Sequence, residues 1–285
     1  MTEPENNFDN KNQITWCPGC GNFSIIAALK NALKTLNYKP HDIVLAGDIG
    51  CSSKLTDYVE VNTFTGLHGR VIPLAQGIKL ANHKLHVIAI GGDGGLFAEG
   101  GNHILHAARR NINITVIVND NQVYALTKGQ ASPTSEKKFI SGPTPEGTIE
   151  NPINPLLVAL ASGATFIARG WAGDNTGLSE IFAQAISHDG FSIVDVLSPC
   201  VSFNKINTLE YYKSRVYKLV DDATYDKSDL TQAFEKVRLW GDHIPIGVIH
   251  EASGPTYEKQ IPVLQKGTLV SQNNGLIDTE KLLDR

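Results

Sequence analysis

Short apolar segments rich in β-branched residues alternate with segments of helical period along most of this chain. Five of the apolar segments predict strands, at residues 42–47, 85–91, 113–119, 164–169 and 191–197. Five segments with apolar residues at three- and four-residue spacing predict helices, at residues 22–36, 70–82, 99–111, 153–161 and 177–188. Because both sides of each predicted strand are apolar, the strands suit a buried parallel sheet. The alternation therefore predicts an α/β fold with a doubly wound, mostly parallel sheet, whose ligands gather at the carboxyl ends of the strands.

The pattern changes after Cys200, where a shorter second part of the chain begins. We expect a main α/β domain over residues 1–205 and a helical extension with a terminal arm over residues 206–285. Helices are predicted at 208–220 and 229–241, and the last thirty or so residues turn polar. With 285 residues, of which 41% are hydrophobic, the chain can bury a sizeable core. No second block of alternating strands and helices is expected, so the extension is predicted to pack on the main domain or on another chain.

Net charge and composition exclude several kinds of partner. The formal net charge is −4, the isoelectric point is near 6.1 and no block of like charge occurs, so we expect no nucleic-acid partner. The first 13 residues are polar and acidic, unlike a signal or transit peptide, and no apolar run is long enough to cross a bilayer. We therefore expect a cytoplasmic protein without membrane contact. In that reducing compartment, the four cysteines are expected to be reduced, metal-bound or redox-active rather than paired in disulfides.

Polar residues and glycines follow two consecutive predicted strands between residues 89 and 130. One strand ends in the run GGDGG at 91–95, and the next ends in NDNQV at 119–123. Glycines around Asp93 let backbone N–H groups approach a diphosphate, while the Asp93 carboxylate, the Asn121 side-chain oxygen and a nearby main-chain carbonyl suit Mg²⁺. An ordinary Gly-Asp-Gly turn is the alternative. A dinucleotide site is disfavoured because no G-x-G-x-x-G motif follows any of the predicted strands.

This spacing resembles the thiamine diphosphate signature, in which Gly-Asp-Gly is followed by Asn a little under thirty residues later. The resemblance implies that Asp93, Asn121 and the main-chain carbonyl of Val123 are the Mg²⁺ ligands. Because the strand, helix and strand context is also present, we interpret this stretch as a thiamine diphosphate and Mg²⁺ site.

The four cysteines allow three interpretations. Cys17 and Cys20 frame a Pro-Gly pair before the first predicted helix, Cys51 follows the first strand, and Cys200 follows the fifth. A structural zinc site usually takes its cysteines as two close pairs, whereas here one pair joins two distant single residues. A redox dithiol would need only Cys17 and Cys20. A [4Fe–4S] cluster uses four thiolates and would add the one-electron carrier that a thiamine enzyme lacks, so we favour it.

Six short motifs extend these two sites into a wider pattern: WCPGCGNF, GDIGCSSK, LHGR, GGDGG, NDNQVYALTKGQASPT and LSPC. Together, over roughly residues 15–205, they resemble the β subunits of archaeal and bacterial 2-oxoacid:ferredoxin oxidoreductases. The resemblance implies a domain that binds thiamine diphosphate, Mg²⁺ and one [4Fe–4S] cluster and that pairs with a separate α subunit. It also implies oxidative decarboxylation of a 2-oxoacid, such as pyruvate or 2-oxoglutarate, to an acyl-coenzyme A and CO₂. Electrons would pass singly through the cluster to ferredoxin.

The resemblance further implies contacts for individual residues. The residues expected to line the cofactor are Ile49, Gly50, Cys51, Ser52, His68, Gly94, Gly95, Leu126 and Thr127. Of these, His68, Gly94 and Gly95 would touch the diphosphate end, and Leu126 and Thr127 would flank the thiazolium. Lys54 would face the substrate carboxylate, with Leu126 on the same side. In the alternative interpretation, His68 caps a helix or binds a loop carbonyl, and Lys54 is a solvated surface lysine.

Two other function classes stay open at this stage. One is a non-oxidative thiamine enzyme, such as a decarboxylase, which would need no cluster. The other is a non-catalytic subunit that carries an iron–sulfur cluster or zinc without thiamine. For a thiamine enzyme, the cofactor must be activated by a carboxylic acid from a second domain, and only one such domain is predicted here. We therefore expect the α subunit to supply that acid, in an αβ or α₂β₂ assembly.

Overall fold

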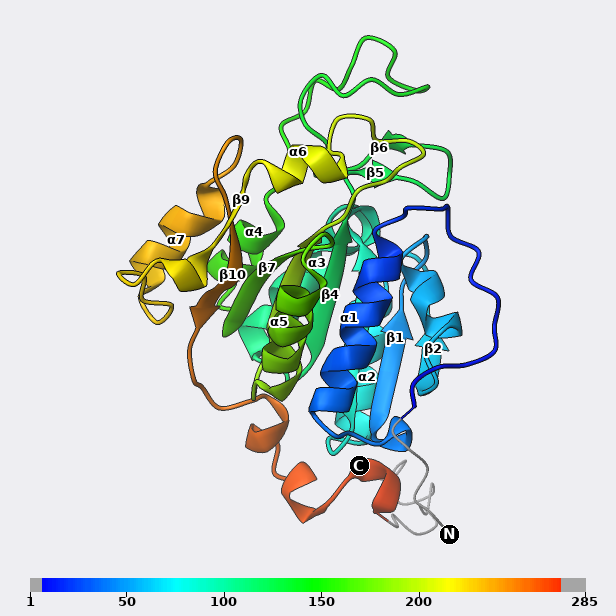
Figure 1. Cartoon of the computed structure of the whole chain (residues 1–285). Helices are drawn as coiled ribbons and strands as arrows, with labels where there is room; N and C mark the ends of the chain where they lie inside the picture. Colours follow the sequence, from blue (N-terminus) through cyan, green and yellow to red (C-terminus); the bar gives the residue numbers. More distant parts are fainter. Residues whose placement is uncertain (1–6, 273–285) are drawn as a thin grey trace, which may run out of the picture.

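The five strands predicted from the sequence lie in one sheet of the computed structural model, which describes residues 7–272 (Figure 1). Within those residues the sheet has eight strands in the order β2-β1-β3-β4-β8-β7-β10-β9. Neighbouring strands run parallel except β7 and β10, which pair antiparallel. The strands are β1 Ile43–Gly47, β2 Asn62–Thr65, β3 His86–Gly92, β4 Thr115–Asp120, β7 Phe166–Trp171, β8 Ser192–Leu197, β9 Val216–Lys218 and β10 Ile244–Glu251. The prediction of a mostly parallel α/β sheet is confirmed.

Helices cover both faces of this sheet, and in Figure 1 α1 and α5 lie in front of it. Along β4, Val116 and Val118 pack in the core beneath α2, α3 and α4, whereas Ile117 packs in the core beneath α1 and α5. The helices are α1 Asn22–Thr35, α2 Val71–Ala81, α3 Gly101–Arg110, α4 Pro155–Ala161 and α5 Asn175–Ser187. Each begins and ends within two residues of its predicted bounds. The doubly wound arrangement is therefore confirmed.

The loops at the carboxyl ends of the strands contain short elements that shape this edge of the sheet. After β3 the chain enters a π-helical turn, η3 Gly95–Glu99, before α3 begins. After β4 it forms a small hairpin of β5 Val123–Tyr124 and β6 Gln130–Ala131. A long excursion then leads to α4, and Figure 1 shows it projecting beyond the carboxyl edge of the sheet.

The region after residue 205 differs from its prediction. The predicted helix at 208–220 was wrong beyond its first part, because α6 ends at Lys213 and Val216–Lys218 forms β9 instead. A strand forms here because β10 offers a free edge with which these residues pair in parallel, at Ile244 to Ile246. The helix predicted at 229–241 is present as α7 Leu230–Arg238. The unit β9-α7-β10 thus extends the same sheet, while the domain boundary near residue 205 stays a prediction.

The polar end of the chain turns back toward the amino ends of the strands. It forms short 3₁₀ turns at Glu258–Gln260, Leu264–Lys266 and Leu269–Ser271. The Tyr257 amide donates to the carbonyl of Asn111, which lies just before β4, at an N···O distance of 3.2 Å. Up to residue 272, the predicted arm therefore contacts its own domain. Residues 273–285 of that arm, and residues 1–6 of the acidic N-terminal segment, lie outside the described residues.

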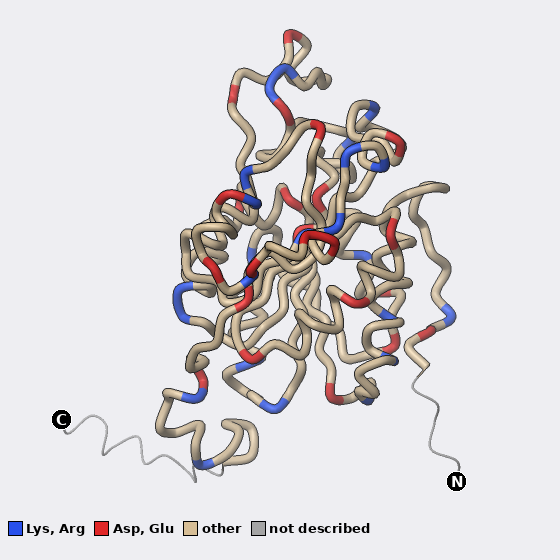
Figure 2. The backbone as a smooth tube through the Cα atoms, turned by 60° about the vertical axis from the view of Figure 1, so that its left-hand side comes forward, with Lys and Arg blue, Asp and Glu red and all other residues tan. Residues whose placement is uncertain are grey.

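Charged residues of both signs are interspersed over the molecule (Figure 2). The described helices include none whose length and apolar character would allow it to cross a membrane.

Candidate active site

Two neighbouring cavities open at the carboxyl ends of the parallel strands. We call the first, of about 90 Å³, the Asp93 cavity and the second, of about 300 Å³, the cysteine cavity. All the residues predicted to bind the cofactor or Mg²⁺ line the Asp93 cavity: Ile49, Gly50, Cys51, Ser52, His68, Asp93, Gly94, Gly95, Asn121, Val123, Leu126 and Thr127. Gly92, Tyr124 and Ala125 line it as well. The structure therefore brings together the loops after β1, β2, β3 and β4.

Sheet register places Asp93 and Asn121 beside each other. Because β3 and β4 pair in parallel with Gly92 opposite Asn119, the two residues leave neighbouring strands at the same edge. The Asn121 side-chain oxygen accepts a hydrogen bond from the Val123 amide at 3.1 Å, which makes a tight turn. Gln122, in the middle of that turn, has a φ of 59°. This turn brings the side chain of Asn121 and the main chain of Val123 to the same wall of the cavity.

Asp93 is almost fully buried, and its carboxylate is surrounded by hydrogen-bond donors. Thr134 donates to its Oδ2 at 2.6 Å, and the Ser132 hydroxyl lies beside Thr134, with 3.2 Å between their oxygens. Burial raises the pKa of Asp93 to about 6, although these hydrogen bonds act in the opposite direction. A cation beside this carboxylate would offset the cost of burying its charge. The donor set thus fits Mg²⁺, which prefers oxygen ligands.

Two further buried carboxylates lie behind Asp93. Asp120 shares the Thr134 hydroxyl at 2.9 Å, and Asp195 lies with its Oδ2 3.7 Å from Nε of the buried Arg169. Burial raises the pKa of Asp120 well above its usual value and raises that of Asp195 to about 6. One arginine therefore faces several buried acids, and this edge of the sheet favours a bound cation.

His68 is held in place by a residue that the sequence analysis missed. Asp48, fully buried at the end of β1, accepts a hydrogen bond from the Gly69 amide at 2.6 Å and lies 3.2 Å from His68 Nδ1. The other ring nitrogen, Nε2, lies 4.0 Å from Glu99 Oε2. The ring is thereby oriented by acids on both sides. Sequence alone offered one signal for Asp48, its position directly after a buried strand.

Close packing explains why glycines occupy positions 94 and 95. A Cβ atom on Gly95 would lie 1.7 Å from the Asp48 carboxylate, and one on Gly94 would lie 2.2 Å from the Tyr124 ring. Neither position can accept a side chain without displacing a wall of the cavity. Both residues line the cavity, and glycine backbone amides can approach a diphosphate closely.

The cysteine cavity is lined by all four cysteines. Cys17 is exposed, Cys20 and Cys51 are half-buried, and Cys200 is buried. Burial, followed by the neighbouring cysteines, raises the pKa of the Cys20 thiol to about 11, and burial also raises that of Cys51. A positively charged metal centre would stabilise the thiolates that burial disfavours. The four thiols therefore line one cavity, and thiolates are ligands that suit a metal centre.

Across residues 7–272, no group of three or more His, Cys, Asp or Glu side chains is arranged so that it could hold a metal ion. The Mg²⁺ ligands and the [4Fe–4S] ligands accordingly stay predictions.

Comparison with known proteins places the chain in a family. Residues 48–196 match the C-terminal TPP binding domain of thiamine pyrophosphate enzymes, and residues 200–266 match the C-terminal region of the pyruvate ferredoxin oxidoreductase β subunit. The 2-oxoacid:ferredoxin oxidoreductase β subunit of Saccharolobus solfataricus is 43% identical over 258 residues, which is 86% of this chain and 85% of that protein. This chain belongs to the 2-oxoacid:ferredoxin oxidoreductase β subunits.

Two further relatives extend the comparison to enzymes of 2-oxoglutarate. The 2-oxoglutarate oxidoreductase subunit KorB of Mycobacterium tuberculosis is 41% identical to this β subunit over 197 residues, which is 69% of this chain and 53% of that protein. A solved structure of 2-oxoglutarate:ferredoxin oxidoreductase from Magnetococcus marinus, with 2-oxoglutarate, coenzyme A and succinyl-CoA bound, superposes with a TM-score of 0.89. That chain is 36% identical, and the match covers 97% of this chain and 94% of that one. The family supports thiamine diphosphate as the cofactor of this β subunit.

Lys54 was predicted to face the substrate, and it lies apart from the predicted cofactor residues. Its Nζ lies 3.1 Å from the Thr15 hydroxyl, and it lines the cysteine cavity rather than the Asp93 cavity. Its substrate-facing role stays a prediction. Cys51 and Leu126, by contrast, line both cavities, so the two spaces share a wall.

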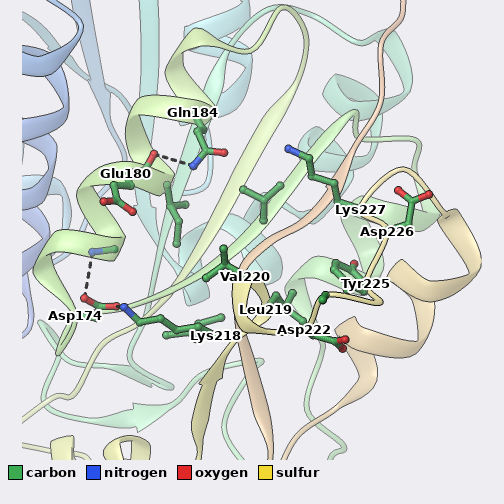
Figure 3. Close-up of a pocket in the computed structure, with 16 residues that line it drawn as sticks. Asp174, Glu180, Gln184, Lys218, Leu219, Val220, Asp222, Tyr225, Asp226 and Lys227 are labelled. Carbon is green, nitrogen blue, oxygen red and sulfur yellow. Dashed lines mark hydrogen bonds and ion pairs between the residues drawn. The ribbon is translucent and has the colours of Figure 1, made fainter.

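A larger cavity of about 560 Å³ lies between α5 and β10 (Figure 3). It shares none of its lining residues with the Asp93 or cysteine cavity. Its acidic and basic groups are partly paired, with Lys218 Nζ 2.7 Å from Asp174 Oδ2. Carboxylates such as Glu180 and Asp226 line it as well, and its two glycines, Gly177 and Gly247, do not form a run like GGDGG.

Proposed function

We propose that this β subunit, together with an α subunit, oxidatively decarboxylates a 2-oxoacid and transfers the acyl group to coenzyme A. One 2-oxoacid, one coenzyme A and two oxidised ferredoxins would give an acyl-coenzyme A, CO₂, a proton and two reduced ferredoxins. The observation that carries this proposal is the wall shared by the two cavities. Cys51 lines both of them, so a single loop after β1 would contact the thiamine cofactor and ligate the electron carrier.

In the proposed complex, the Asp93 cavity holds the diphosphate end of the cofactor. Asp93, Asn121 and the Val123 carbonyl would bind Mg²⁺, while the amides of Gly94 and Gly95 would approach the diphosphate. Thiamine diphosphate, when bound, supplies the electron sink for decarboxylation. This chain would bind and orient that cofactor and would exclude water from the metal ligands.

The proposed electron carrier is a [4Fe–4S] cluster bound by Cys17, Cys20, Cys51 and Cys200. The four thiols line one cavity, which adjoins the Asp93 cavity, so electrons would have a short path between the two groups. A single cluster accepts one electron at a time, and ferredoxin is a one-electron acceptor. Ferredoxin is named in the activity of the relatives from Saccharolobus solfataricus and Magnetococcus marinus.

The α subunit is proposed to complete the cofactor site. A cavity of about 90 Å³ is far smaller than the roughly 300–1,000 Å³ of pockets that enclose a ligand of this size. Apolar side chains on its walls are also exposed, with Ile49 at 41% and Leu126 at 47% of their surface. A second chain covering this face would bury them, enclose the cofactor and supply the activating acid.

Anaerobic purification of the chain with and without its α subunit tests this proposal. We expect the chain alone to carry near four iron and four sulfide per chain, yet to show no 2-oxoacid-dependent reduction of viologen or ferredoxin. Adding the α subunit should restore turnover, and a substrate panel with pyruvate and 2-oxoglutarate would define the 2-oxoacid. Stoichiometric zinc without iron, or full activity from the rigorously purified single chain, would contradict the proposal.

A further inference from the structure

A run of hydroxyl side chains, Ser132-Pro133-Thr134-Ser135, is buried between the loops that carry the proposed Mg²⁺ ligands. It follows β6, and its three hydroxyl residues are at most 8% exposed. We call Ser132, Thr134 and Ser135 the hydroxyl clamp. Burying three hydroxyl groups costs free energy unless each has a hydrogen-bond partner. The partners of these hydroxyls therefore indicate the role of the loop.

Thr134 contacts the proposed metal carboxylate directly. Its Oγ1 lies 2.6 Å from Asp93 Oδ2 and 2.9 Å from Asp120 Oδ1, so one hydroxyl connects the strand end after β3 with the end of β4. Ser132 supports the same contact, because its Oγ lies 3.2 Å from Thr134 Oγ1. The carboxylate of Asp93 is therefore fixed by a side chain that is 41 residues away along the chain.

Ser135 secures the loop that carries the other two proposed ligands. Its hydroxyl donates to the carbonyl of Gln122 at 2.5 Å and accepts from the Ser132 amide at 2.8 Å. Gln122 lies between Asn121 and Val123, so the bond holds the peptide that connects them. The hydroxyl clamp thus contacts both halves of the proposed ligand set.

We propose that Thr134 is a positioning residue for Mg²⁺, holding Asp93 in the orientation that the metal requires; this inference rests on the proposed function. The physical reason is that a carboxylate free to rotate must lose that freedom when the metal binds, whereas a hydrogen-bonded one has already lost it. Removing such outer hydrogen bonds typically costs about 10–100-fold in metal affinity.

The test uses the assembled complex with its α subunit, stripped of Mg²⁺ and thiamine diphosphate by a chelator. Thiamine diphosphate binding is followed by calorimetry at increasing Mg²⁺ concentration. We expect Thr134→Val, which keeps the shape but removes the hydroxyl, to raise the Mg²⁺ concentration for half-maximal binding about 10–100-fold. Thr134→Ser should stay within about threefold of the parent protein, because serine keeps the hydroxyl that binds Asp93. If the role of Thr134 were purely steric, serine would not restore binding.

Thr115→Val is the matched control. Thr115 is also a buried threonine, at the start of β4, but its hydroxyl donates to the Ala185 carbonyl far from the cavity. This variant should leave the Mg²⁺ dependence unchanged. If Thr134→Val does not assemble, Ser132→Ala takes its place, with a smaller expected rise.

Three outcomes would overturn parts of the argument in distinguishable ways. Parent-like Mg²⁺ dependence in Thr134→Val, or in Ser132→Ala where that variant replaces it, would overturn the positioning role. A Thr134→Ser variant as weak as Thr134→Val would overturn it as well, because packing would then explain the loss. Absence of Mg²⁺-dependent binding in the parent complex would overturn the proposed function and, with it, this inference.

Discussion

The Asp93 cavity and the cysteine cavity share a wall but are built in different ways. The Asp93 cavity takes its lining from residues 49–127, at the ends of four strands that are neighbours in the sheet. The cysteine cavity draws on residues as far apart as Thr15 and Phe203. The first offers backbone amides and oxygen atoms, and the second offers four thiols with Lys54 and Lys128 beside them.

This difference separates what the sheet provides from what the loops provide. Parallel pairing of β3 and β4 is sufficient to bring Asp93 and Asn121 together, so the Asp93 cavity depends on strand register. The cysteine cavity requires the segment before α1 and the segment after β8 to meet over the loop after β1. We therefore expect substitutions in the two cavities to have separable effects, except at the residues that line both.

The largest expected effect is that of Asp93→Ala. It removes the only carboxylate among the proposed Mg²⁺ ligands, so Mg²⁺-dependent thiamine diphosphate binding should fall at least about a hundredfold, beyond the usual loss of an outer hydrogen bond. Calorimetry of the complex measures this loss, and iron content should remain near that of the parent protein. Asp174→Ala, in the larger cavity of Figure 3, is the control and should bind the cofactor normally.

Unchanged cofactor affinity in Asp93→Ala would mean that the GGDGG run is an ordinary turn. Loss of iron together with thiamine would mean that the two cavities do not form independently. Asn121→Ala should weaken binding less than Asp93→Ala, because the amide oxygen carries no net charge.

Cys51→Ser should affect both cavities, with a large effect in the cysteine cavity and a smaller one in the Asp93 cavity. Serine is a poor ligand for iron, so the cluster and the electron transfer to viologen should be lost. Because Cys51 also lines the Asp93 cavity, thiamine diphosphate affinity should fall several-fold as well. Cys17→Ser is the matched comparison, since Cys17 lines the cysteine cavity alone. Equal cofactor affinities in the two variants would show that the shared wall has no functional importance.

Much of the fold and of the Asp93 cavity could be predicted because the relevant signals are local. Each helix of the doubly wound core has its own apolar period, and the glycines and Asp93 follow directly after a buried strand. Asp48 and Thr134 could not be predicted in the same way. Their importance depends on contacts with His68 and Asp93, which only the folded chain brings within hydrogen-bond distance.

The error at β9 has a related cause. The segment 208–220 has a helical apolar period, and α6 uses the first part of it. Val216–Lys218 nevertheless becomes a strand because β10, nearly 30 residues later, provides a partner edge. Tertiary pairing of this kind overrides a local pattern when the segment is short and β-branched or aromatic residues are present.

The smallest expected effect is that of Lys54→Ala. This variant tests whether Lys54 acts on the substrate or on the cysteine cavity. If it faces the substrate carboxylate, Lys54→Ala should raise the apparent KM for every 2-oxoacid about tenfold, the scale of one charge-assisted hydrogen bond of roughly 1.5 kcal/mol. Steady-state kinetics of the complex measure this, with Lys205→Ala as an exposed lysine control. Lys54 lines the cysteine cavity, where its charge lowers the pKa of Cys51 against the effect of burial. An unchanged KM with a lowered cluster reduction potential would therefore assign Lys54 to the cysteines, because a nearby positive charge favours the reduced cluster.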